Sequence, residues 1–328
     1  MTQHHPILVV GGAVAPAAQD AAHSRGIMLS SCKPYPDAAE LAEAANAIGA
    51  QGLVVRLGRV PREAITQIRS LRIVAKHGVG IDGIDIDAAC ERGIPVVVAG
   101  GANAQSVAEQ GLALLLGVAR STAYLDRRIR EGHWDKSTYA GSEVAGKTVG
   151  LIGLGAIGRS FLTLLRPFGV TARVYDPYLP VHELPEGVES VDSVDALLAS
   201  SDIVSLHCPL TADNRGLIDA RAIAGMRRGA ILINTARGEL IDEAALVGAL
   251  RDGRLGGAGL DTFASEPIQA NHPFLALDNV VVSPHVGANT NEARARVGVK
   301  CIEQIADYLE RGSLDPRNHV NKAVPATL

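Results

Sequence analysis

The feature that most constrains this chain is a short apolar run followed by a glycine-rich turn and then by a helical pattern. Residues 149–152 read Val-Gly-Leu-Ile, which predicts a buried strand, and residues 153–158 read Gly-Leu-Gly-Ala-Ile-Gly. Gly153 allows a tight turn, Gly155 lets a pyrophosphate approach the backbone, and Gly158 lets the helix pack closely on the strand. The N–H groups at the start of that helix can then hold phosphate charge. The pattern predicts a dinucleotide-binding unit.

A carboxylate follows the turn at the spacing that such units use. The strand-like segment 172–175 ends on Asp176, about 20 residues beyond the turn. A carboxylate there can bind ribose hydroxyls and would repel a 2′-phosphate, so NAD is favoured over NADP. The alternative is that Asp176 is only a turn residue before Pro177.

Composition excludes several classes of protein. The length of 328 residues suits two domains, and 47% apolar with 20% charged residues indicates a globular chain. A net charge of −4 without a Lys/Arg block argues against nucleic acid as a partner. No apolar run reaches about 18 residues without interruption, so no membrane span is expected. The start lacks the features of a signal peptide, and the four scattered cysteines suit reduced thiols, so we expect a cytoplasmic protein. No Cys/His spacing indicates a metal site.

The first hundred residues alternate apolar strands with helical patterns. The strands expected at 7–10, 53–55, 73–75 and 95–98 are apolar throughout, which is typical of a parallel sheet covered on both faces. The glycine-rich segment 76–82 then lies at the carboxyl edge of that sheet, where its N–H groups could hold a carboxylate; it could also be an ordinary loop. Lys76 and Arg56, each at a strand end, either add positive charge to this edge or are solvated surface groups.

The second half repeats the alternation and places polar residues at four strand ends. The strands expected at 203–206, 230–234, 257–260 and 280–282 precede His207, Thr235, Asp261 and Ser283, and a long helix covers about 289–310. The segment 127–134, with the only Trp, either reaches a partner subunit or forms a solvated surface helix.

Three of the residues at or after strand ends could act together in oxidation of a 2-hydroxy acid. Arg237 could bind a carboxylate in bidentate fashion, and His285 could take the hydroxyl proton while hydride leaves C2 for a nicotinamide. Glu266 could orient His285 and stabilise its cationic form. Each also has an ordinary explanation as a surface or satisfied residue, and spacing alone does not show that they converge.

The chain resembles the D-isomer-specific 2-hydroxyacid dehydrogenases, and within them the D-3-phosphoglycerate dehydrogenase branch. The resemblance covers nearly the whole length and rests on seven ordered motifs, at 76–85, 103–109, 153–159, 207–211, 229–242, 259–267 and 283–290. In that family the arginine of NTARG, the glutamate of EP and the histidine of PH are catalytic. They fall on Arg237, Glu266 and His285.

The resemblance also implies binding residues. Cofactor contacts fall on Gly153, Leu154, Gly155, Ala156, Ile157, Gly158, Asp176, His207, Cys208, Pro209, Thr235, Ala236, Arg237, Asp261, His285 and Gly287. Substrate contacts fall on Val79, Gly80, Asn103 and Arg237, with Lys76 and Arg56 where the phosphoglycerate branch often has basic residues. The two basic residues favour a substrate with a second anionic group.

The implied architecture is α/β, with two Rossmann-like, doubly wound parallel-sheet domains and a cleft between them. A flavodoxin-like substrate-binding domain would comprise residues 1–101 and 290–328, and the NAD-binding domain residues 102–289. Dimerisation through the NAD-binding domain is usual in the family, so we expect a homodimer.

The leading hypothesis is an NAD-dependent D-2-hydroxyacid dehydrogenase or 2-keto acid reductase. Two alternatives stay open. One is a hydroxypyruvate or glyoxylate reductase of the same family, and the other is a non-catalytic NAD-sensing protein on this fold. A formate-type enzyme is disfavoured because such enzymes typically have Gln where this chain has Glu266.

Overall fold

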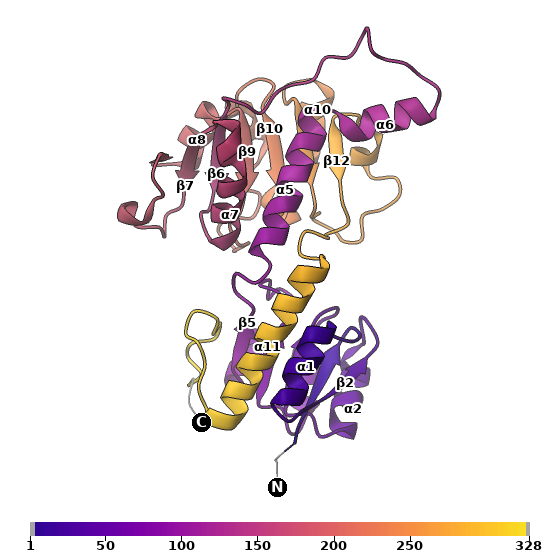
Figure 1. The fold of residues 1–328 in the computed structure, drawn as a ribbon, viewed down its shortest axis with the longest axis vertical. Coiled ribbons are helices and arrows are strands. Elements are labelled where there is room, and N and C mark those ends of the chain that lie inside the picture. The colour runs from indigo at the N-terminus through magenta and orange to yellow at the C-terminus, as the bar shows by residue number, and fades with distance from the viewer. Residues whose placement is uncertain (1–3, 326–328) are drawn as a thin grey trace. The chain divides into compact units, whose positions relative to one another are not determined.

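The computed structural model describes residues 4–325, which form two compact units (Figure 1). Unit 1 contains the described residues up to 103 and those from 288 onward, and unit 2 contains residues 104–287. The sequence-based boundaries lie at 101/102 and 289/290, two residues away at each crossing. Whether unit 1 binds the substrate stays a prediction.

Unit 1 is built on a parallel sheet of five strands in the order β2-β1-β3-β4-β5. This is the flavodoxin-like order for a doubly wound sheet. Its strands are β1 (His5–Val10), β2 (Ile27–Cys32), β3 (Gly52–Val55), β4 (Ile73–Lys76) and β5 (Val96–Val98).

Helices cover both faces of this sheet because successive strand side chains point to opposite sides. The helices are α1 (Pro16–Ser24), α2 (Ala38–Ala47), α3 (Arg62–Gln67), α4 (Ile86–Glu91) and α11 (Asn291–Arg311). Ile7 of β1 lies in the core shared with α1 and α11, whereas Leu8 lies in the core shared with α2, α3 and α4. Helix α11, at the yellow end of the colour scale, packs beside the indigo α1 although the two are far apart in sequence (Figure 1).

The described C-terminal segment packs on unit 1, the domain to which the sequence analysis assigns residues 290–328. The Val96 N–H donates to Oδ1 of Asn321 (2.8 Å), and His319 forms a bridge with Val97. The tail therefore extends the edge of the sheet at β5. Residues 326–328 lie outside the described part.

Unit 2 contains a parallel sheet of seven strands in the order β12-β11-β10-β9-β6-β7-β8. From β6 the chain adds β7 and β8 on one side and β9 to β12 on the other, so the strand order reverses between β6 and β9. Ligands of such folds bind at that point, outside the carboxyl ends of the strands. Its strands are β6 (Thr148–Ile152), β7 (Thr171–Tyr175), β8 (Val188–Ser190), β9 (Ile203–Leu206), β10 (Ile231–Asn234), β11 (Gly257–Leu260) and β12 (Val280–Val282).

Helices also cover both faces of the second sheet. The α-helices are α5 (Ala104–Ala119), α6 (Thr122–Arg130), α7 (Ala156–Leu165), α8 (Val194–Ser200), α9 (Ala220–Gly225) and α10 (Glu243–Arg251). The 3₁₀ turns are η1 (Arg166–Phe168), η2 (Val181–Glu183), η3 (Gly238–Leu240) and η4 (Pro273–Ala276). Helix α5 packs on α7, β10 and β11 on one face (Figure 1).

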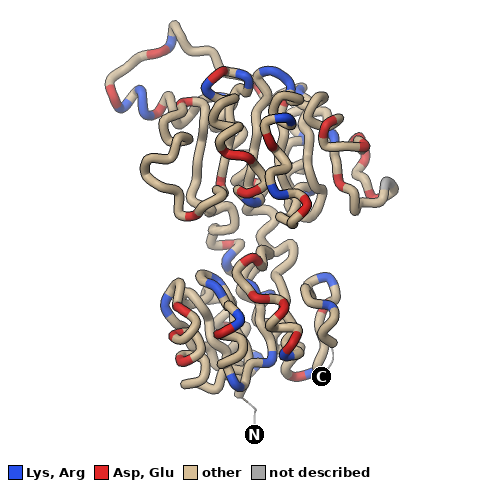
Figure 2. Tube along the Cα trace, turned by 180° about the vertical axis from the view of Figure 1, so that it is seen from behind, with Lys and Arg blue, Asp and Glu red and all other residues tan. Residues whose placement is uncertain are grey.

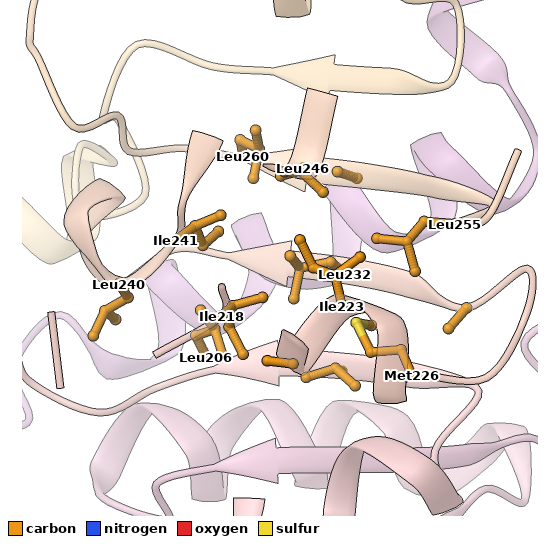
Figure 3. Close-up of a cluster of buried hydrophobic side chains, with 14 of the residues drawn as sticks. Leu206, Ile218, Ile223, Met226, Leu232, Leu240, Ile241, Leu246, Leu255 and Leu260 are labelled. Carbon is orange, nitrogen blue, oxygen red and sulfur yellow. The ribbon is translucent and has the colours of Figure 1, made fainter. Parts of the chain in front are cut away.

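The opposite face of the second sheet holds a cluster of aliphatic side chains (Figure 3). Leu206, Leu232 and Leu260 come from adjacent strands, and Ile223 and Leu246 reach them from α9 and α10. Removing one such leucine side chain costs about 2–5 kcal/mol, so this layer fixes the strand ends that carry the polar residues. The two parallel-sheet units confirm the predicted fold class.

Charges of both signs are interspersed along the trace of both units (Figure 2). Within residues 4–325, no helix combines the length and the apolar character needed to cross a membrane.

Candidate active site

The glycine turn after β6 is shaped by contacts that exclude a side chain. Gly153 has a φ of +92°, and a Cβ there would lie 2.9 Å from the backbone nitrogen of Cys208. A Cβ on Gly158 would lie 2.6 Å from the carbonyl oxygen of Gly153. These two glycines therefore let α7 approach the ends of β6 and β9.

Gly155 differs because a Cβ there would meet open space. It is the N-cap of α7 and provides no side-chain cap, so the first N–H groups of the helix are left for another acceptor. Ala156 beside it is exposed, Ile157 is half-buried, and Leu154 is buried. This geometry fits a dinucleotide pyrophosphate: the glycine leaves room for it, and the helix start supplies donors.

Asp176 is held against the same turn. Its Oδ2 accepts the Leu154 N–H (2.8 Å), and its Oδ1 accepts the Tyr178 N–H (3.0 Å). Each carboxylate oxygen keeps a further lone pair for ribose hydroxyls. The structure thus brings together the carboxylate and the turn that the sequence pairs by spacing.

The end of β9 contributes a neutral segment. The His207 Nε2 lies 2.9 Å from Ser205 Oγ, and its ring packs on Phe161 with centroids 5.1 Å apart. Burial lowers the pKa of His207 to about 4 and raises the pKa of the Cys208 thiol to about 11. Both side chains are therefore uncharged near pH 7, and Pro209 next to them is exposed. The backbone of His207 and Cys208 is what reaches Gly153.

Asn234 shapes the turn that follows β10. Its side-chain Nδ2 donates to the Arg237 carbonyl (2.7 Å), and its Oδ1 accepts the Ala236 N–H (2.9 Å). Asn234 is fully buried, and the Thr235 Oγ1 beside it is a buried oxygen without a hydrogen-bond partner among the described residues. The sequence-based reasoning missed Asn234, although an amide closing an apolar strand is a visible signal.

Asp261 at the end of β11 holds the turn that carries His285. Its Oδ1 accepts the Ser283 hydroxyl (2.6 Å) and the Val286 N–H (2.9 Å), and its Oδ2 accepts the Gly287 N–H (2.8 Å). Its carbonyl accepts the His285 N–H (2.8 Å). Asp261 is 1% exposed, so these bonds use a carboxylate shielded from water.

The backbone of His285 is in the left-handed region, with a φ of +53°. A non-glycine residue in that conformation is uncommon and costs free energy, so the bonds from Asp261 stabilise an unusual local shape. Ser283 is a further residue of this turn that sequence-based reasoning did not assign; its Oγ also accepts from Gln110 Nε2 (2.8 Å).

The His285 side chain pairs with Glu266. Its Nδ1 lies 2.8 Å from Glu266 Oε2, while the other oxygen, Oε1, accepts the Phe263 N–H (3.1 Å). A carboxylate accepts hydrogen bonds, so Nδ1 carries a proton and Nε2 is the atom that can exchange one with a substrate. The side chains are 47% and 37% exposed, which leaves them open to small molecules.

Arg237 lies on the turn that follows β10. Its Nη1 donates to the Ala236 carbonyl (2.7 Å), and the guanidinium is half-buried. A Cβ on the next residue, Gly238, would lie 1.9 Å from the carbonyl carbon of Phe263. The backbone after Arg237 thus packs directly on the segment that bonds Glu266, and unit 2 brings the elements of all three predicted residues together.

Unit 1 gathers basic groups at the carboxyl ends of β3 and β4. The Arg56 guanidinium donates to the carbonyls of Gly11 and Ala13, and the Lys76 Nζ donates to the Arg56 carbonyl (3.4 Å). Burial and the nearby charge of Arg294 lower the pKa of Arg56. Burial and the Arg56 charge lower the pKa of His77 to about 4, so His77 is neutral at pH 7.

The other predicted substrate residues of unit 1 vary in exposure. Val79 is 39% exposed, and Gly80 is half-buried in the loop after β4. Asn103 is 4% exposed, and its Oδ1 has no hydrogen-bond partner within the described residues. In the part of the chain that the structure describes, no group of three or more His, Cys, Asp or Glu side chains could hold a metal ion.

Part of the chain matches a protein-family model. Residues 112–287 match the model described as D-isomer specific 2-hydroxyacid dehydrogenase, NAD binding domain. This range holds the glycine turn and the His285 turn.

Curated relatives include D-3-phosphoglycerate dehydrogenases and a hydroxypyruvate reductase. The D-3-phosphoglycerate dehydrogenase of Methanocaldococcus jannaschii is 44% identical over 265 residues, which are 80% of this chain and 50% of that protein. The hydroxypyruvate reductase of Thermotoga maritima is 44% identical over 256 residues, 77% of this chain and 83% of that protein. The chain spans about half the length of the phosphoglycerate dehydrogenases that it matches.

Solved structures share the fold over nearly the whole chain. A glyoxylate reductase from Paecilomyes thermophila superposes with a TM-score of 0.86 at 30% identity, covering 97% of this chain and 99% of that one. A glyoxylate/hydroxypyruvate reductase from Sinorhizobium meliloti, in complex with NADP and malonate, has a TM-score of 0.84 at 28% identity, covering 99% of both chains.

Proposed function

Because the chain belongs to the D-isomer specific 2-hydroxyacid dehydrogenase family and carries its NAD-binding domain, we propose that it interconverts a small 2-hydroxy acid and its 2-keto acid. The observation that carries the proposal is the 2.8 Å contact between His285 Nδ1 and Glu266 Oε2. It fixes the ring so that Nε2 can exchange a proton with a substrate oxygen. The same turn is held by Asp261 at the carboxyl edge of the sheet.

The proposed chemistry needs a carboxylate anchor and a proton carrier. Arg237 would bind the substrate carboxylate through two parallel N–H donors and hold C2 in place. In oxidation, His285 Nε2 takes the hydroxyl proton; in reduction it returns that proton to the keto oxygen. Glu266 keeps the ring oriented and places a carboxylate beside Nδ1. Bound NAD would accept the hydride from C2 in oxidation, and NADH would supply it in reduction.

We propose NAD rather than NADP as the cofactor. The Asp176 carboxylate is anchored beside Leu154, where it can accept ribose hydroxyls. A 2′-phosphate would place negative charge against this carboxylate.

The substrate is proposed to carry a second anionic group. Arg56, Lys76 and Arg294 place positive charge at one edge of unit 1, which suits a phosphate or a second carboxylate. A 3-phosphoglycerate-like acid has this chemistry, and several relatives are named for it.

Hydroxypyruvate or glyoxylate is the second candidate substrate. The relative from Thermotoga maritima is named a hydroxypyruvate reductase, and 83% of its length is matched. These acids need only Arg237 and His285. The two candidate substrates therefore differ in whether they need the basic side chains at the edge of unit 1.

A homodimer through unit 2 is also proposed. Helix α6 has no buried residue, and Ile129 and Trp134 are 54% and 77% exposed. Apolar side chains of that size on an arm suit burial against a second copy.

The function is tested by following NADH oxidation with glyoxylate, hydroxypyruvate and phosphohydroxypyruvate. Turnover of at least one is expected, with NADPH as the cofactor comparison. Tight NADH binding without turnover of any acid in a broad 2-keto acid panel would contradict the enzyme and favour an NAD-sensing protein.

A further inference from the structure

One carboxylate, that of Glu243, closes the loop that carries Glu266. The Ala264 N–H donates to Glu243 Oε1 (2.9 Å), and His272 Nε2 lies 3.3 Å from Glu243 Oε2. Glu243 begins α10, where the helix N-terminus favours negative charge. It therefore binds both ends of the segment 264–272.

This segment has little other support. Residues 264–267 and 269–271 are exposed, and Ile268 between them is only partly buried. Exposed loops open at low free-energy cost unless polar contacts restrain them. Glu266 lies within this stretch, two residues after Ala264, so its position depends on how the ends are held.

The state of His272 follows from its neighbours. The Phe274 N–H donates to His272 Nδ1 (3.3 Å), which requires a lone pair on that nitrogen. The proton of the neutral ring is then on Nε2 and points to Glu243. The ring also contacts Phe274, 4.8 Å between centroids, and Phe263, 6.5 Å between centroids.

The closed loop connects directly to the proposed acid–base pair. Phe263, adjacent to the bonded Ala264, donates its N–H to Glu266 Oε1, and Glu266 Oε2 contacts His285. Gly238, adjacent to Arg237, packs on the same backbone at Phe263 and Ala264. A shift at Ala264 therefore moves the donor that orients the Glu266 carboxylate.

We propose that Glu243 and His272 are positioning residues that hold Glu266 against His285. The proposal rests on the function proposed above for its kinetic consequence, but the positioning itself can be measured without turnover. Neither residue would touch substrate or cofactor. In this role they act on Glu266, and through it on His285.

The direct test follows the imidazole of His285 by ¹H–¹⁵N NMR at a fixed pH in the protein without cofactor, with the signals assigned by their loss in His285→Gln. The Nδ1–H proton that faces Glu266 is expected far downfield while it bonds to a carboxylate, and Glu266→Gln should move it upfield. Glu243→Gln should move it in the same direction. A Nδ1–H signal that is unchanged in Glu243→Gln overturns the proposal.

Kinetics provides the second test. Glu243→Gln should lower kcat by about tenfold, yet change it by less than about twofold in a Glu266→Gln background, because coupled residues are not additive. His272→Gln keeps a donor for Glu243 and should lose less than His272→Ala. Equal additive losses in both backgrounds would mean that Glu243 acts on general stability and not through Glu266.

A matched control is Asp195→Asn. Asp195 lies in the first turn of α8 and pairs with Arg221 (2.9 Å). The substitution removes one negative charge, as Glu243→Gln does, at a residue that pairs with α9 and not with the described segment 264–272. It should leave the Nδ1–H signal of His285 and kcat unchanged. If the wild type turns over no 2-keto acid, the proposed function fails while the NMR signal of His285 still decides the positioning role.

Discussion

His285 Nδ1 lies 2.8 Å from Glu266 Oε2, and the backbone that holds each residue comes from a different strand end. The turn after β12 supplies His285 and the segment after β11 supplies Glu266. The pair thus depends on the register of two neighbouring parallel strands. This contact is the source of the first prediction.

Replacing Glu266 by Gln keeps the size of the side chain but removes its charge. The His285 ring then loses the charged acceptor that orients it, so kcat for 2-keto acid reduction should fall by about 10–100-fold. Steady-state kcat at saturating NADH and keto acid, with the Tm of both proteins, checks this. An unchanged kcat would show that the carboxylate does not act on His285.

Replacing Arg237 by Lys keeps the charge but loses the planar pair of donors. Carboxylate binding should weaken and kcat/KM should fall by about 100-fold, mostly through KM. The measurement is initial rate against keto acid concentration at saturating NADH. A KM within about twofold of the wild type, in a variant with unchanged Tm, would remove Arg237 from carboxylate binding.

Asp176→Ser removes the carboxylate beside the glycine turn. NADH should bind less tightly because ribose contacts are lost, and NADPH should bind more tightly because repulsion is removed, so the preference for NADH narrows by about tenfold or more. Fluorescence titration of both cofactors gives the ratio. A ratio equal to that of the wild type would mean that Asp176 does not contact the ribose.

His207 couples stability to pH. Burial lowers its pKa to about 4 from the ordinary 6.5, so the unfolded chain binds the extra proton between these values. The free energy of unfolding therefore falls as pH drops below 6.5 and stops falling on this account near pH 4.

His207→Gln removes this titration. In that window the slope of unfolding free energy against pH should decrease by up to about 1.4 kcal/mol per pH unit. Urea unfolding of the protein without cofactor, at several pH values, gives both slopes. Equal slopes would show that His207 is not held neutral in the folded state.

Much of the fold could be predicted from the sequence because its signals are local. The apolar strands, the turn at 153–158 and the long helix Asn291–Arg311 each follow from spacing within a few residues. Asp176 could be paired with the turn because a fixed spacing accompanies the motif.

The supports of the site could not be predicted, because their contacts join residues far apart in the chain. Asp261 bonds Ser283 and Gly287 across 22 and 26 positions, and Glu243 bonds Ala264 and His272 across 21 and 29. Neither set of contacts follows a fixed sequence spacing from which it could be predicted.

Side-chain direction was also beyond the sequence. His207 stays a predicted cofactor residue, but its ring packs on Phe161 and its Nε2 contacts Ser205. Its backbone is therefore the part left for such a contact. Residue type alone would have favoured the imidazole.

The central claim is that His285 exchanges the proton during NADH-dependent reduction of a 2-keto acid. Its most direct test is kcat/KM for the best keto acid in the wild type and in His285→Gln, with the dissociation constant of NADH measured for both. We predict measurable turnover in the wild type, a loss of about 1,000-fold or more in the variant, and NADH binding within about twofold. A variant that keeps the wild-type rate would contradict the account.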